Sequence, residues 1–167
     1  MKTSAGLLVY RIKTNQPEVL IVHPGGPFWS KKDRGAWSIP KGEYDETEDP
    51  LNTAKREFEE ETSFPPPNGE YIDLGEIKRK DGKYIKAWAV EGDLDETKIK
   101  SNEFEMEWPP KSGLLQKFPE IDRGAWFSLD EAAEKVQPAQ IPFLERLAKK
   151  LNTTFEVPTE FEQGSLF

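Results

Sequence analysis

The stretch that decides the fold is Gly42 to Phe64, with the sequence GEYDETEDPLNTAKREFEEETSF. Its middle predicts a helix, because Asp49 can accept hydrogen bonds at the N-cap and Pro50 suits the first helical turn, where a missing N–H costs nothing. The helix has to end before residues 65–67, which are all proline, since proline disfavours helical geometry in the residue before it. We therefore expect a helix that runs to about Thr62.

Three glutamates share one face of this expected helix. Glu57, Glu60 and Glu61 fall within an arc of about 100°, because positions i, i+3 and i+4 lie together on a helix. Like charges at these spacings repel each other, so the cluster needs either solvent or a cation around it. An acidic face exposed to solvent is the commoner explanation of such a pattern taken alone. The spacing of the residues around it favours a bound divalent metal instead.

The whole segment resembles the Nudix box, the signature of the Nudix hydrolase family. The box reads Gly, five residues, Glu, seven residues, Arg-Glu, an aliphatic or aromatic residue, any residue, Glu-Glu, any residue, Gly and an apolar residue. Its positions are filled here by Gly42, Glu48, Arg56, Glu57, Phe58, Glu60, Glu61 and Phe64. The sequence departs from the box at one position, because Ser63 stands in place of the second glycine. Glycine after a helix usually takes a left-handed conformation that costs another residue about 1 kcal/mol, so the change concerns the helix end and not the acidic face.

The resemblance extends over roughly residues 3–135 and implies the Nudix fold, an α/β fold in which a mixed β-sheet is sandwiched between α-helices. It also implies a set of metal ligands: Glu57, Glu60, Glu61 and the backbone carbonyl of Lys41. The implied cofactor is Mg²⁺, with Mn²⁺ as an alternative, because hard cations prefer oxygen ligands. Glu48 and Arg56 are expected to orient these ligands, since a guanidinium can hold a carboxylate with two parallel hydrogen bonds.

Members of the family often recruit a further acid from outside the box, six residues before a tryptophan that opens a late strand. Glu120 and Trp126 show this spacing, so Glu120 is the leading candidate for a further catalytic acid and metal ligand. Three acids of the preceding segment compete with it: Glu103, Glu105 and Glu107. Bound metal lowers the pKa of water and stabilises charge on the leaving group, so water can displace at phosphorus without a protein nucleophile. We therefore expect a Nudix pyrophosphohydrolase.

A local group of basic and aromatic residues indicates the substrate. The expected substrate-binding residues are Lys41, Lys31, Lys32, Arg34, Phe28 and Trp29. The cations stand out in a chain of net charge −8 and suit a polyphosphate. The aromatic rings can stack on a base, although packing in the core is their commoner fate. These residues predict a small-molecule nucleotide substrate, either a dinucleoside polyphosphate or a nucleoside triphosphate.

Other substrates and other classes of function stay open at this point. The alternatives are a nucleotide sugar such as ADP-ribose, a diphosphoinositol polyphosphate, and a catalytically silent Nudix-fold module that binds a nucleotide. The proline or tyrosine that other branches of the family carry some fifteen to seventeen residues past the box is absent, because Lys78, Arg79 and Lys80 stand there. This weakens the ADP-ribose interpretation. An acidic α/β protein unrelated to the family is the third class.

Composition limits the remaining functions. The chain has 167 residues and 35% hydrophobic content, which suits one domain, expected over residues 1–151 with an acidic tail at 152–167. A net charge of −8 argues against general binding of nucleic acid, since that affinity comes from many basic contacts to phosphates. With one histidine, His23, and no cysteine, a zinc site of His and Cys is excluded. No apolar run approaches the ~20 residues of a membrane-spanning helix, so we expect a soluble, cytoplasmic protein that does not bind membranes.

The remaining elements follow from residue patterns. Aliphatic and β-branched runs predict strands at residues 4–12, 18–23, 36–39 and 124–127. Strands at 71–79 and 84–90 flank a Gly-containing tight turn and are expected to form a hairpin. Helices are expected at 129–136 and 143–151. Residues 92–122 show no sustained periodicity of apolar residues and are expected to form a long, partly ordered insertion.

Overall fold

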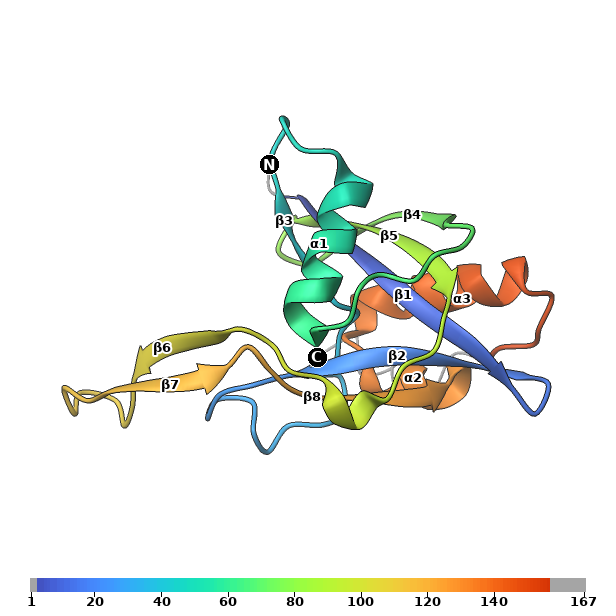
Figure 1. Cartoon of the computed structure of the whole chain (residues 1–167). Helices are drawn as coiled ribbons and strands as arrows, with labels where there is room; N and C mark the ends of the chain where they lie inside the picture. Colours follow the sequence, from blue (N-terminus) through green and yellow to red (C-terminus); the bar gives the residue numbers. More distant parts are fainter. Residues whose placement is uncertain (1–2, 157–167) are drawn as a thin grey trace.

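The computed structural model describes residues 3–156, and these form a six-stranded mixed sheet with a two-stranded sheet beside it (Figure 1). The strands of the main sheet are β1 (Thr3–Lys13), β2 (Gln16–Pro24), β3 (Lys41–Tyr44), β4 (Ile72–Lys78), β5 (Tyr84–Glu91) and β8 (Ile121–Ser128). They follow the order β4-β5-β1-β2-β8, and β3 pairs with the start of β1. β1 and β5 are parallel, whereas the other neighbours are antiparallel. The sheet is therefore mixed, as the resemblance implies.

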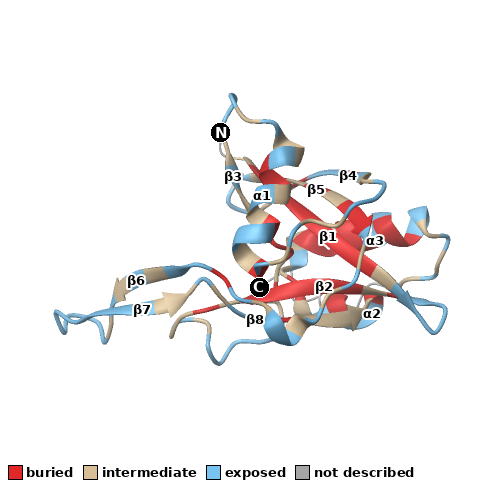
Figure 2. Ribbon diagram, in the orientation of Figure 1, coloured by how far each residue is buried: buried red, intermediate tan, exposed pale blue. Residues whose placement is uncertain are grey.

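Helices cover both faces of this sheet. They are α1 (Pro50–Thr62), α2 (Leu129–Lys135) and α3 (Ile141–Lys150), with short 3₁₀ turns η1 (Glu96–Lys98) and η2 (Pro138–Gln140). Neighbouring residues of β1 serve opposite faces, because side chains alternate along a strand. Leu7 packs in one cluster with Phe58 of α1, and Leu8 packs in the other with Phe143 of α3. Figure 2 shows the buried residues concentrated in the central strands between the helices, which confirms the predicted α/β arrangement.

Two hairpins of the main sheet, of which the β4–β5 hairpin was predicted, form around turns that are coded locally. β1 and β2 are joined by Thr14 and Asn15, whose φ angles of 53° and 64° belong to a two-residue turn that matches the twist of the strands. β4 and β5 pair around Gly82, whose φ of 86° lies in the region that favours glycine. α1, α2 and α3 also begin and end within a few residues of the predicted limits.

Residues 36–39 do not form the predicted strand. Ser38 pairs with Val22 of β2 and Trp37 pairs with Val136 after α2, each as an isolated bridge. The prediction was wrong because this segment crosses between two partners and makes one backbone pairing with each, so no continuous ladder develops. The strand forms further along the chain, at β3.

The segment from residue 92 to 122 is more ordered than predicted. β6 (Glu103–Glu107) and β7 (Leu115–Pro119) pair antiparallel in a two-stranded sheet that projects away from the main sheet (Figure 1). We call residues 103–119 the arm. Phe104 and Phe118 face each other across it with ring centroids 6.1 Å apart, whereas most of its other residues are exposed. The hairpin was missed because its strands are only five residues long and, within residues 3–156, most of its side chains pack against no second layer.

No helix within residues 3–156 is long and apolar enough to cross a membrane. After α3 the chain continues to residue 156 without further helix or strand, and Phe155 packs against the α2 and α3 side of the core. The rest of the predicted acidic tail, residues 157–167, lies outside the described residues.

Candidate active site

The α1 helix begins and ends at residues that suit its termini. The Asp49 side chain accepts a hydrogen bond of 3.0 Å from the Asn52 N–H and caps the first turn. At the other end Ser63 has a φ of 69°, the left-handed conformation for which the Nudix box uses glycine. Its N–H donates to the Glu59 carbonyl at 2.8 Å, and its hydroxyl donates to the Lys100 carbonyl. These bonds offset a backbone cost of about 1 kcal/mol, so the departure from the box leaves the helix intact.

β3 places the box glycine directly against the middle of α1. Gly42 lies so close to Glu57 that a Cβ atom at this position would be 2.2 Å from the Glu57 Cδ atom. Two atoms cannot approach that closely without a bond, so any side chain at position 42 would displace the carboxylate. Glycine therefore gives Glu57 the room to lie half-buried between the sheet and the helix.

Glu57 and Glu61 lie in surroundings that disfavour their ionised forms. Burial raises the pKa of Glu57 to about 7, together with the charge of Glu60 and a hydrogen bond between these two side chains. Burial likewise raises the pKa of Glu61 to about 8, together with the charges of Glu57 and Glu120. Lys41 acts in the opposite direction on the pKa of Glu61, through its ammonium charge and a hydrogen bond from its backbone N–H. Negative charge is thus crowded at this point of α1, and a cation would relieve it.

Glu120 joins the acidic group from the junction of β7 and β8. Its N–H donates to the Asn102 carbonyl at 2.8 Å, and its own carbonyl accepts from the Gly25 N–H at 2.8 Å. A Cβ atom on Gly25 would lie 2.0 Å from the Pro119 carbonyl oxygen, so the two chain segments are in close contact. The charge of Glu120 contributes to the raised pKa of both Glu57 and Glu61. The three competing acids lie along the arm on β6 (Figure 1): Glu103, Glu105 and Glu107.

Arg56 connects the box acids with the loop before α1. Its Nη1 donates to the Glu48 carboxylate at 2.9 Å, and this hydrogen bond is the main reason why the pKa of Glu48 is lowered. Its Nη2 lies 3.7 Å from the Glu57 carboxylate, and its Nε lies 3.8 Å from that of Glu60. One guanidinium thus contacts an acid of the loop and two acids of the helix. The structure brings together all the residues that the sequence predicted for this part of the box.

The acidic side chains form pairs and not a closed metal cage. Within residues 3–156, the Asp, Glu and His side chains form no group of three or more that could hold a metal ion as they stand. The donor chemistry nevertheless fits a hard cation, because every candidate ligand is a carboxylate or a backbone oxygen. The raised pKa values of Glu57 and Glu61 fit as well, since a divalent ion would stabilise both ionised forms. Glu57, Glu60 and Glu61 share one face of α1, so their side chains can turn toward a common ion.

A cavity of about 150 Å³ opens beside Glu61, and its lining includes Lys41 and Gln137. We call it the Lys41 cavity. Burial lowers the pKa of Lys41, and the positive charges of Arg79 and Lys83 lower it further, while Glu61 opposes them. Arg79, Lys83 and Gln137 were not predicted as part of the site, because nothing in the local sequence shows that the β4–β5 turn and the end of α2 face Lys41. The run of basic residues in that turn was the available signal.

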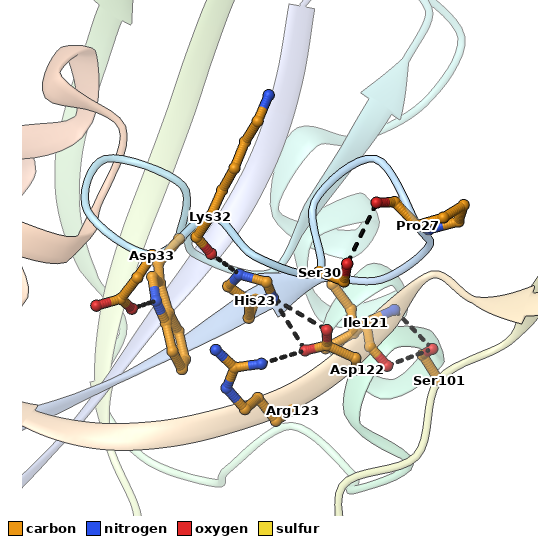
Figure 3. A network of polar contacts seen from close by, with 10 residues as sticks. His23, Pro27, Ser30, Lys32, Asp33, Ser101, Ile121, Asp122 and Arg123 are labelled. Carbon is orange, nitrogen blue, oxygen red and sulfur yellow. Dashed lines mark hydrogen bonds and ion pairs between the residues drawn. The ribbon is translucent and has the colours of Figure 1, made fainter.

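The loop of residues 24–35 is anchored by the His23 side chain (Figure 3). His23 is fully buried, and its Nδ1 lies 3.0 Å and 3.1 Å from the two carboxylate oxygens of Asp122 at the start of β8. Its Nε2 lies 2.5 Å from the carbonyl oxygen of Lys32 in the loop. One buried ring therefore joins the loop to the strand that follows Glu120. The sequence offered no sign of this role beyond the presence of a single histidine.

The same loop carries most of the residues predicted to bind substrate. Phe28 is 66% exposed, and the Lys32 ammonium lies 4.4 Å from the centre of its ring and 5.0 Å from that of Trp29. Arg34 lies 3.9 Å from a glutamate of α2, and Lys31 is exposed. Among the described residues, those that line the Lys41 cavity include none of these five. The structure thus places Lys41 beside the acids and the other predicted residues on the loop.

Comparison with known protein families explains this arrangement of acids. A family model described as the NUDIX domain matches residues 2–147. The chain belongs to the Nudix family. The predicted family, the α/β Nudix fold and the assignment as a Nudix pyrophosphohydrolase are thereby confirmed. A search of curated proteins found no match to this Nudix protein.

Several solved structures resemble this Nudix protein in fold. An Ap4A hydrolase from C. elegans, solved as a binary complex, is 20% identical with a TM-score of 0.61, over 91% of this chain and 98% of that chain. The NUDIX domain of Shewanella oneidensis NrtR, solved with ADP ribose, is 16% identical with a TM-score of 0.59, over 89% of this chain and 87% of that chain. A mutT/nudix family protein from Listeria innocua is 17% identical with a TM-score of 0.58, over 90% and 93%. At these identities the similarity shows the fold alone.

Proposed function

We propose that this Nudix protein hydrolyses a diphosphate bond in a nucleotide with several linked phosphates, a dinucleoside polyphosphate or a nucleoside triphosphate, with Mg²⁺ as cofactor. The observation that carries the proposal is that Glu57, Glu60 and Glu61 share one face of α1 and that Lys41 lines the same cavity as Glu61. Crowded carboxylates favour a divalent cation. The neighbouring ammonium offers a contact to a phosphate beyond the pair that is cleaved.

The proposed metal ligands are the acids of the α1 face and two groups from other elements. Glu57, Glu60 and Glu61 would hold the metal, with Glu120 and the backbone carbonyl of Lys41 as further ligands. When bound, magnesium lowers the pKa of water and neutralises phosphate oxygens, which allows water to displace at phosphorus. Mn²⁺ has the same preference for oxygen and is expected to substitute.

The remaining residues orient these groups. Arg56 is held by a hydrogen bond to Glu48 and lies 3.7 Å from Glu57 and 3.8 Å from Glu60, so its guanidinium would orient these two carboxylates toward the metal. Glu120 comes from a different element and is exposed, so its carboxylate can accept the proton of the attacking water or join the metal ligands.

The preference for a substrate with several linked phosphates rests on the positive charge near Lys41, because the fold alone does not distinguish between substrates. The C. elegans protein is an Ap4A hydrolase and the NrtR domain was solved with ADP ribose, so relatives with this fold differ in ligand. Here the charges of Arg79 and Lys83 act on Lys41 and add to its own, which suits a chain of phosphates better than a single diphosphate. A silent binding module is the second candidate, and the complete set of box acids argues against it, because a binding module has no need of every ligand.

Turnover of diadenosine tetraphosphate, ATP and ADP-ribose tests the proposal, with Mg²⁺, Mn²⁺ or EDTA present. We expect activity only with metal, and a higher kcat/KM for the two polyphosphates than for ADP-ribose. Glu60→Gln should lower kcat about 100-fold or more, because a ligand of the reacting cluster is lost, whereas the exposed Glu59→Gln should not. Lys41→Ala should penalise the polyphosphates more than ADP-ribose. Near wild-type activity of Glu60→Gln at saturating Mg²⁺ would contradict the metal site, and a wild-type preference for ADP-ribose would contradict the substrate.

A further inference from the structure

A second cavity, of about 470 Å³, lies between the turn of the β4–β5 hairpin and the chain that follows α2. We call it the hairpin cavity. Lys78, Arg79 and Lys80 line it from the hairpin, and Pro138 and Ala139 line it from η2. Its volume falls within the ~300–1,000 Å³ of small-molecule sites, and it offers both apolar and cationic groups.

The hairpin cavity adjoins the Lys41 cavity. Gln137 lines both of them, so the two cavities lie against the same residue. Glu61 and Lys41 also line the smaller cavity. The hairpin cavity is thus the neighbouring space for a ligand whose reacting group lies at Glu61.

Positively charged side chains also extend from Lys41 to the β4–β5 turn. Three cations of the hairpin line its cavity: Lys78, Arg79 and Lys80. The pKa of Lys41 is lowered mainly by burial, and the charges of Arg79 and Lys83 lower it further, so the positive charge of the turn reaches the active site. Asp81 balances part of this charge, because its carboxylate lies 3.0 Å from the Arg79 guanidinium. In a protein of net charge −8, such a concentration of cations next to an acidic metal-binding face is the setting for an extended anion.

The hairpin turn holds these cations in place. The Arg79 N–H donates to the Lys83 carbonyl at 2.7 Å, and the Gly82 N–H donates to the Arg79 carbonyl at 3.0 Å. The Asp81 side chain accepts from the Lys83 N–H at 3.1 Å. A turn closed by three hydrogen bonds presents its side chains in a defined direction, unlike a flexible loop.

We propose that the hairpin cavity binds the part of the substrate beyond the cleaved bond: Arg79 contacts the distal phosphates, Lys83 adds positive charge from the same turn, and Pro138 and Ala139 contact the group that these phosphates carry. The ligand class is a linear polyphosphate ester with at least three phosphates. The proposal rests on the proposed function and deepens it, because it assigns the length preference to the β4–β5 turn and not to the loop of residues 24–35.

Binding of inorganic tripolyphosphate tests the cavity independently of catalysis. Calorimetric titration in EDTA should show about tenfold weaker binding for Arg79→Gln than for the wild type, since a guanidinium contact to phosphate is lost. Lys149→Gln on the exposed face of α3 removes the same charge far from the cavity and should change the affinity less than twofold. Because Arg79 pairs with Asp81, a loss could come from a disturbed turn, so Lys83→Gln, at an exposed position, should give a loss in the same direction. Equal binding by the hairpin variants and Lys149→Gln overturns the proposal.

Kinetics with Mg²⁺ supply the second measurement. Arg79→Gln should lower kcat/KM for diadenosine tetraphosphate about tenfold, mainly through KM, and should change that for ADP-ribose less than twofold. An equal loss on both substrates overturns the assignment to distal phosphates. If the wild type turns over neither substrate, the proposed function fails, while the tripolyphosphate titration still decides whether the cavity binds phosphate chains.

Discussion

Replacement of Glu61 by glutamine is expected to stabilise the metal-free protein at alkaline pH. Burial, with the charges of Glu57 and Glu120, raises the pKa of Glu61 in the folded protein to about 8, against an ordinary value of 4.5. Because the folded pKa lies above the unfolded one, the stability that Glu61 contributes is fully present below pH 4.5 and is lost as the pH rises toward 8. Glutamine has a similar shape and never ionises, so it avoids this loss.

The size of the effect follows from the two pKa values. One pKa unit corresponds to about 1.4 kcal/mol, so ionisation of Glu61 costs at most about 5 kcal/mol in the folded protein. Rearrangement of the side chain and entry of water reduce this figure, and we expect about 2 kcal/mol. For a domain of this length 1 kcal/mol shifts Tm by about 2–4 °C, so Glu61→Gln should melt about 4–8 °C above the wild type.

Thermal melting in EDTA at pH 5 and at pH 8.5 measures this difference. The gain should be present at pH 8.5 and absent at pH 5, and saturating Mg²⁺ should remove it, because a bound cation stabilises the ionised glutamate of the wild type. Glu59→Gln, an exposed change on the same helix, is the control and should not alter Tm. A lower Tm for Glu61→Gln at pH 8.5, or an equal rise at both pH values, would refute the reasoning.

Three further changes test other parts of the site. Glu120→Gln should lower kcat at least tenfold with little change in KM, whereas Glu105→Gln on the arm should leave kcat near wild type. Steady-state kinetics measure both variants. A larger loss of kcat in Glu105→Gln would assign the outer acid to the arm instead. Gly42→Ala should lower kcat at least tenfold, because a Cβ atom 2.2 Å from the Glu57 Cδ displaces that carboxylate. Unchanged kinetics would show that the close approach of Gly42 to Glu57 is not needed for activity. His23→Ala should lower Tm by about 5–10 °C, because it empties a fully buried position and removes the ring that contacts both the Asp122 carboxylate and the Lys32 carbonyl; an unchanged melting curve would exclude the anchor role.

Much of the acidic face could be predicted because its signals are local. The cap at Asp49, the prolines at 65–67 and the i, i+3, i+4 spacing of the glutamates each act within one or two helical turns. The left-handed backbone at Ser63 could also be anticipated from its place at the helix end, and φ is 69° there. Local geometry of this kind is largely independent of the rest of the chain.

The parts that were missed depend on contacts between distant segments. Residues 36–39 are aliphatic enough for a strand, but two different partners divide their backbone bonds. β6 does alternate polar and apolar residues, although five residues of alternation are too few to stand out in a segment rich in proline. The approach of the β4–β5 turn to Lys41 follows from the sheet order, in which β5 and β3 both pair with β1, and no local pattern encodes it.

The two ends of the arm lie side by side. Asn102 precedes β6, Glu120 follows β7, and the 2.8 Å bond from the Glu120 N–H to the Asn102 carbonyl closes the base of the arm. We therefore expect residues to be added or removed in the turn around Gly113 without a change in the position of Glu120, because the base stays closed. The tip is the place where an insertion can add new surface to this enzyme.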